Sequence, residues 1–143
     1  MANNDMPARP IPIILLVEDS EDDAYFFERA LRRSGRECLL KHVSDGGGAV
    51  KLLREALSDI SRMPDLIFLD LKMPVMSGFE VLEWIRRQEF PGTLPVIVLS
   101  GSDQETDRLR ALELGASEFI VKPIKASGLA ERLQNLTAAL AVR

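Results

Sequence analysis

Five short apolar runs recur along the chain, and a polar segment with helical periodicity follows each one. Continuous runs of β-branched and aliphatic residues are typical of strands buried on both faces of a parallel sheet. The predicted strands are residues 11–17, 38–43, 65–70, 95–100 and 118–122. The predicted helices are 49–58, 78–88, 104–114 and 126–142, after a first helix with an apolar stripe of Tyr25, Phe26, Ala30 and Leu31 that ends near Gly35.

This alternation of strands and helices predicts an α/β fold with a doubly wound, mostly parallel sheet covered by helices on both faces. The pattern occupies residues 11–142 of a 143-residue chain, which suits a single domain. We therefore expect one domain over 11–143. Residues 1–10 contain two prolines and no periodicity, so they are expected to form a flexible tail.

Composition narrows the class of protein. The formal net charge is −4, and no long basic run is present, which argues against nucleic-acid binding. Cys38 is the single cysteine and cannot form an internal disulfide. No apolar run approaches the ~20 residues that span a bilayer, and the N-terminus lacks the apolar stretch of a signal peptide. We expect a cytoplasmic protein whose partners are other proteins.

Polar side chains stand where the predicted strands end, the edge at which doubly wound sheets bind ligands. They are Glu18 and Asp19, Asp70, Ser100, and Lys122. Three carboxylates together repel one another unless a cation neutralises them, and carboxylate oxygens suit Mg²⁺. Histidine and cysteine are missing from these positions in the sequence, which disfavours zinc. An aspartate beside Mg²⁺ can attack phosphorus and form an aspartyl phosphate.

In this order along the chain, several short motifs resemble those of bacterial two-component receiver domains. The motifs are Val17-Glu18-Asp19, Leu69-Asp70-Leu71-Lys72-Met73-Pro74, Ser77-Gly78, Leu99-Ser100-Gly101 and Val121-Lys122-Pro123. The resemblance covers roughly residues 11–140. It implies the flavodoxin-like strand order 2-1-3-4-5, and a protein that catalyses only its own phosphorylation and dephosphorylation. More specifically, the chain is similar to the small regulators that partner bacteriophytochromes.

Carried over residue by residue, the resemblance implies that Asp70 is the phosphoacceptor. Glu18 and Asp19 match the acidic pair around the metal, and Lys72 would offer its backbone carbonyl to the same Mg²⁺. Lys122 matches the family's lysine that faces the phosphoryl group. The phosphoryl donor would be a sensor histidine kinase or a histidine phosphotransfer protein.

The resemblance also implies a switch. Ser100 matches the hydroxyl residue that moves toward the phosphoryl group, and Phe119 matches the coupled aromatic on the last strand. A cis peptide is expected before Pro123, since cis bonds are tolerated at proline. The fourth helix, fifth strand and fifth helix would form the output face, used for homodimerisation or partner docking. Lys72 and Ser102 occupy the positions that tune dephosphorylation in the family.

Three other functions are compatible with parts of this pattern. An aspartyl phosphatase would need a second acid two residues after the nucleophile, where this chain has Lys72. A flavin-binding carrier would need a phosphate-binding loop after the first strand, where this chain has an acidic run from Glu18 to Asp23. A receiver that binds partners without being phosphorylated is the third alternative, and only phosphorylation data separate it from the main prediction.

Overall fold

The computed structural model describes residues 11–90 and 92–141, so the tail predicted over residues 1–10 lies outside the described part of the chain. All five predicted strands are present, and each begins or ends within two residues of its predicted limits. The strands are β1 (Ile13–Val17), β2 (Leu39–Val43), β3 (Leu66–Leu69), β4 (Val96–Ser100) and β5 (Glu118–Val121). They pair in parallel in the order β2-β1-β3-β4-β5, which confirms the predicted doubly wound fold.

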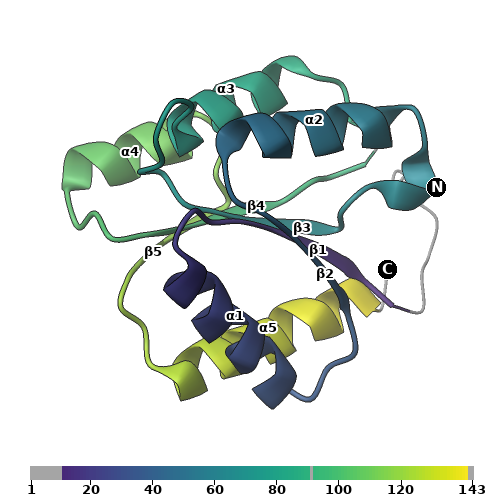
Figure 1. The fold of residues 1–143 in the computed structure, drawn as a ribbon, viewed down its shortest axis with the longest axis vertical. Coiled ribbons are helices and arrows are strands. Elements are labelled where there is room, and N and C mark those ends of the chain that lie inside the picture. Colours follow the sequence, from purple (N-terminus) through teal and green to yellow (C-terminus); the bar gives the residue numbers. More distant parts are fainter. Residues whose placement is uncertain (1–10, 91, 142–143) are drawn as a thin grey trace.

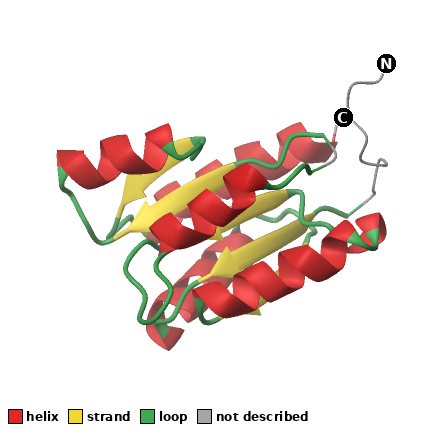
Figure 2. Ribbon diagram, turned by 90° about the horizontal axis from the view of Figure 1, so that it is seen from above, coloured by secondary structure: helices red, strands yellow, loops and turns green. Residues whose placement is uncertain are grey.

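Helices cover both faces of this sheet (Figure 1). They are α1 (Glu21–Arg33), α2 (Gly46–Leu57), α3 (Gly78–Arg87), α4 (Glu105–Glu113) and α5 (Ala126–Ala141). Helices α1 and α5 lie on one face, and α2, α3 and α4 lie on the other, so the molecule has three layers (Figures 1 and 2). None of the helices in the described part of the chain combines the length and the apolar character that a membrane crossing requires.

Burial on both faces explains why the central strands β1, β3 and β4 are continuously apolar. Along β1, Leu15 and Val17 point into the core beneath α2, α3 and α4, whereas Ile14 and Leu16 point into the core beneath α1 and α5. Successive strand residues face opposite sides. Since neither side of β1 meets water, every position of the strand is buried.

Two helical predictions were wrong in detail. Helix α2 begins at Gly46 and not at Ala49, because the Asp45 side chain accepts a hydrogen bond from the Gly48 N–H at 2.6 Å and caps the helix before its three glycines. In α1, Tyr25 was predicted to belong to the buried stripe, but it is 58% exposed. Ala24 and Phe27 fill the core in its place.

The connection between α2 and β3 contains a short 3₁₀ helix, η1 (Ile60–Arg62). The Asp59 side chain accepts a hydrogen bond from the Ser61 N–H and so starts this turn. Helix α1 is capped by Ser20, whose hydroxyl accepts a hydrogen bond from the Asp23 N–H at 3.2 Å.

Candidate functional site

The side chains predicted to form the site come from neighbouring strand ends. Glu18 and Asp19 follow β1, Asp70 follows β3, Ser100 ends β4, and Lys122 follows β5. Strand β3 lies between β1 and β4 in the sheet. Because parallel strands end at the same edge, this order sets Asp70 between the acidic pair and the serine.

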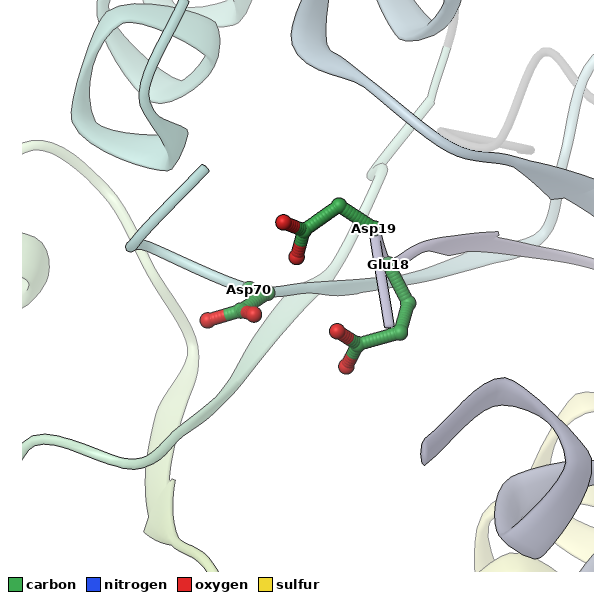
Figure 3. A group of neighbouring side chains, drawn as sticks. All are labelled: Glu18, Asp19 and Asp70. Carbon is green, nitrogen blue, oxygen red and sulfur yellow. The ribbon is translucent and has the colours of Figure 1, made fainter. Parts of the chain in front are cut away.

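Three carboxylates gather at this edge (Figure 3). One carboxylate oxygen from each of Glu18, Asp19 and Asp70 lies within 4.8 Å of the other two. Glu18 and Asp70 are only 3% and 7% exposed, whereas Asp19 is exposed. Oxygen ligands of this kind fit a hard divalent cation, which would also relieve the repulsion among the three charges.

Close backbone contacts fix Asp70. The Asp70 N–H donates a hydrogen bond to the Val17 carbonyl at 3.1 Å, and the Lys72 N–H donates to Asp70 Oδ1 at 3.2 Å. The start of α3 packs directly behind the aspartate, since a Cβ on Gly78 would lie 2.3 Å from the Asp70 carbonyl oxygen. The Ser77-Gly78 motif therefore reflects a requirement for close approach of two backbones.

Lys122 bridges the acidic groups. Its Nζ donates hydrogen bonds to Glu18 Oε1 and Asp23 Oδ2, both at 2.8 Å, and lies 3.6 Å from Asp70 Oδ2. Burial lowers the pKa of Lys122, but its hydrogen bonds to Asp23 and Glu18 outweigh burial and raise this pKa above the usual range. The lysine is therefore a fixed positive charge beside Asp70 at any physiological pH.

Glu18 is held in an unfavourable place for a charge. Burial raises the pKa of Glu18 to about 7, and repulsion from Asp70 adds to this effect, against the hydrogen bond from Lys122 that lowers it. The Ser20 N–H also donates to Glu18 Oε2 at 3.2 Å, and His42 Nε2 lies 2.8 Å from the Glu18 carbonyl oxygen. A bound cation would compensate the cost of ionising this carboxyl group.

The two predicted switch residues lie on adjacent strands. Ser100 is fully buried, and Phe119 is half-buried. The register pairs Val98 with Phe119 and Ser100 with Val121, so Ser100 and Phe119 face the same side of the sheet. Phe119 packs against the core beneath α2, α3 and α4. The expected cis peptide between Lys122 and Pro123 is present.

Two carboxylates near the site were not predicted. Asp23, on the first turn of α1, binds Lys122 as described above. Asp107, on the first turn of α4, accepts a hydrogen bond from Ser102 Oγ at 2.6 Å and lies 3.1 Å from Lys72 Nζ. Asp23 stands in the acidic run after β1, which offered a signal, but nothing in the local sequence singles out Asp107.

Comparisons with known proteins agree with this geometry. The family described as the response regulator receiver domain matches residues 14–134. Among curated relatives, the chain is 32% identical over 124 residues to a probable methanogenesis regulatory protein, FilR2, of Methanothrix harundinacea, covering 87% of this chain and 80% of that protein. It is 30% identical over 128 residues to PilH of Pseudomonas aeruginosa, covering 90% and 97% of the two chains.

Some matching relatives are longer. The transcriptional regulatory protein AfsQ1 of Streptomyces coelicolor is 35% identical over 124 residues, but the chain spans only 50% of its length. The activity of those whole proteins therefore extends beyond the matched part.

Solved structures show the same fold. The Mn²⁺-bound form of response regulator Rcp1 superposes with a TM-score of 0.74 at 32% identity, covering 87% of this chain and 91% of that one. The phosphorylated cyanobacterial phytochrome response regulator RcpA superposes with a TM-score of 0.76 at 33% identity, covering 88% and 91%. The predicted likeness to phytochrome-associated regulators is thus confirmed among the structural neighbours.

Proposed function

This chain belongs to the response regulator receiver domain family, and we propose that Asp70 is the residue on which it accepts a phosphoryl group, with Mg²⁺ held by Glu18, Asp19 and Asp70. Receiver domains are phosphoacceptor proteins of two-component signalling that interact with histidine kinases, and they are not conventional enzymes. The proposal concerns the residues, the metal and the partners of this particular chain.

The observation that carries the proposal is the placement of Asp70 within a cluster of three acids and beside the Lys122 ammonium. Its carboxylate lies in the group of three acids that fits a divalent cation, and Lys122 Nζ lies 3.6 Å from its Oδ2. In the transfer, an Asp70 oxygen bonds to phosphorus as the bond from phosphorus to the donor's nitrogen breaks. When bound, the metal would share the negative charge on the phosphoryl oxygens.

Four other residues of the chain have proposed roles at the phosphoryl group or in the response to it. Lys122 is positioned to bind a phosphoryl oxygen, and the Lys72 backbone carbonyl is a further proposed metal ligand. Ser100 is proposed to donate a hydrogen bond to another phosphoryl oxygen, and Phe119 to repack when Ser100 moves. Since Ser100 and Phe119 face the same side of the sheet, a shift in the serine can reach the aromatic ring through side-chain packing.

We propose that the phosphoryl donor is a sensor histidine kinase or a histidine phosphotransfer protein in the cytoplasm. The output would run through the face formed by α4, β5 and α5, as a homodimer or as a docking surface for a protein partner. This face has exposed apolar side chains at Leu109 on α4 and Val121 on β5, which are 47% and 41% exposed. Nucleic acid and membrane are not proposed as partners.

The test is intact mass spectrometry after incubation with acetyl phosphate, with and without Mg²⁺. The wild-type chain should gain one phosphoryl mass only with Mg²⁺, and Asp70→Asn should gain none. Asp22→Asn, which removes an exposed acid from α1, is the matched control and should behave as wild type. No gain in the wild type, together with no beryllofluoride binding, would favour a receiver that works without phosphorylation.

A further inference from the structure

A chain of side-chain contacts connects the loop after Asp70 to helix α4. Lys72 Nζ lies 3.1 Å from Asp107 Oδ2, and Ser102 Oγ donates a hydrogen bond to the same oxygen at 2.6 Å. Ser102 in turn donates its N–H to Ser100 Oγ at 3.2 Å. One carboxylate on α4 thus contacts both loops that border Asp70.

Lys72 is anchored beside Asp70 at its backbone, whereas its ammonium lies at the end of a long and mostly exposed side chain. Its N–H donates to Asp70 Oδ1 at 3.2 Å, while its side chain is 61% exposed and extends over the Phe79 ring, with Nζ 5.8 Å from the ring centroid. A lysine carries its charge on a flexible four-carbon stem with rotatable donors. The same ammonium can therefore stay on Asp107 or swing back toward a group on Asp70.

Asp107 is the more buried partner in this pair. Its side chain is 20% exposed, and the hydrogen bond from Ser102 fixes its orientation. One turn further along α4, the Arg110 guanidinium stacks over the Phe79 ring at 4.2 Å and ties the helix to α3. The carboxylate is thus held in place before Lys72 reaches it.

We propose that Asp107 is a positioning residue that holds the Lys72 ammonium away from a phosphoryl group on Asp70 and thereby shortens the lifetime of the aspartyl phosphate. The inference rests on the proposed function, since it requires Asp70 to be the phosphoacceptor. The competing acceptor is the phosphoryl group itself, which brings more negative charge than a carboxylate and three acceptor oxygens.

The effect follows from how the aspartyl phosphate hydrolyses. A water oxygen bonds to phosphorus from the side opposite Asp70, the bond from phosphorus to the Asp70 oxygen breaks, and inorganic phosphate and a free carboxylate result, with one proton released. When Lys72 lies across the phosphoryl oxygens, its side chain takes space that this water needs. When Asp107 holds Lys72, the approach is open and hydrolysis is faster.

The experiment measures the lifetime directly. Protein is phosphorylated with acetyl phosphate and Mg²⁺, the donor is removed by desalting, and loss of the phosphoryl mass is followed in time. Asp107→Asn should lengthen the lifetime roughly two- to fivefold, the range expected from a partly exposed ion pair. Glu105→Gln removes a charge from the same turn of α4, where Glu105 pairs only with Arg108 among the described contacts, and should leave the lifetime unchanged.

A double-mutant cycle distinguishes positioning of Lys72 from a general effect on α4. Lys72→Ala should shorten the lifetime, and adding Asp107→Asn to it should change nothing further. Equal lengthening by Asp107→Asn in both backgrounds would show that the aspartate acts through Ser102 or the helix and would overturn the proposal. Asp107→Glu, which retains the charge, should return the lifetime toward that of the wild type.

The outcomes also separate this inference from the proposed function. If the wild-type chain is phosphorylated on Asp70 but its lifetime is unchanged or shorter in Asp107→Asn, the role of Asp107 is refuted and the site stands. If the wild-type chain is not phosphorylated at all, both ideas fail together. Urea unfolding of each variant verifies that the chains compared are folded.

Discussion

Replacing Gly78 with alanine is expected to displace Asp70, because two stretches of backbone meet at this glycine. An added Cβ would lie 2.3 Å from the Asp70 carbonyl oxygen and 2.7 Å from the Leu71 Cα. Both distances are well inside van der Waals contact, and neither neighbouring atom belongs to a side chain that can rotate away. The start of α3 and the end of β3 must therefore move apart.

The size of the effect is a balance of two terms. Alanine is favoured over glycine in a helix by about 1 kcal/mol, whereas overpacking a well-filled site costs roughly 1–3 kcal/mol. Since the clash is between backbones, we expect the upper part of that range and a net loss of stability of about 1–2 kcal/mol. Gly47→Ala is the matched control: it changes a glycine in the first turn of α2, where the nearest atom would be 3.6 Å away.

Urea unfolding measures the free energy of unfolding of each variant. It can be monitored by circular dichroism and by the fluorescence of Trp84, the only tryptophan. Gly47→Ala should be stabilised by about 0.4–1 kcal/mol, in contrast to Gly78→Ala. The rate of phosphorylation by acetyl phosphate should also fall at least about tenfold in Gly78→Ala, because a displacement near 1 Å can reduce a rate by roughly a hundredfold. Equal stability gains in both variants, with wild-type phosphorylation, would refute the reasoning.

Two further predictions concern charge and the switch. Burial raises the pKa of Glu18 to about 7 in the folded chain, above the ~4.3 of an unfolded glutamate. Between these two values the folded state retains a proton that the unfolded state has lost. The free energy of unfolding, measured in EDTA, should therefore fall as pH rises from about 4 to 7. Glu18→Gln should remove most of this fall, and a titration curve identical to that of the wild type would contradict the assignment. Phe119→Ala should leave phosphorylation intact but abolish the phosphorylation-induced amide shifts in α4, whereas Ile120→Ala, on the opposite face of β5, should retain them. Unaltered shifts in Phe119→Ala, measured by NMR, would remove this residue from the switch.

The fold could be predicted because every position of the three central strands, β1, β3 and β4, is buried. The apolar runs predicted five strands, and the family resemblance supplied their order in the sheet. The buried position of β1 between two helical layers is the reason for the apolar signal. Tyr25 shows where the pattern fails. On an amphipathic helix the boundary between faces is broad, and a large aromatic side chain next to Phe26 and Phe27 fits the buried stripe in sequence although it lies in solvent.

The limits of α2 were mispredicted for a different reason. Three glycines in succession disfavour a helix on propensity alone, yet Gly46 opens one, since its position beside Met76 admits no side chain: a Cβ there would lie 2.7 Å from the Met76 carbonyl oxygen. Tertiary contact overrides local propensity here. The same kind of close approach explains Gly78, which the sequence marked only through its resemblance to a family motif.

Within the site, the strand-end residues were predictable and the residues that restrain them were not. Glu18, Asp19, Asp70, Ser100 and Lys122 each follow or end a strand, so topology alone brings them together. Asp23 and Asp107 project from helices. Their partners lie 99 and 35 positions away in sequence, and pairing across such separations depends on how each helix is rotated against the sheet.

These two aspartates have equivalent places in the fold. Each is the third residue of its helix, Asp23 in α1 and Asp107 in α4, and each pairs with a lysine beside Asp70, the proposed phosphoacceptor. A carboxylate in the first helical turn is stabilised by the helix dipole, so both are persistent acceptors. Under the proposed function, a phosphoryl group on Asp70 would compete with Asp23 for Lys122 and with Asp107 for Lys72. The ion pair to α1 on one side of the sheet and the ion pair to α4 on the other would both resist the proposed movement of the lysines toward Asp70. The α4 contact also includes Ser102, whose N–H donates a hydrogen bond to the Ser100 hydroxyl. We therefore expect loss of the Lys72 pair to loosen the loop that borders Ser100, the residue proposed to move on phosphorylation.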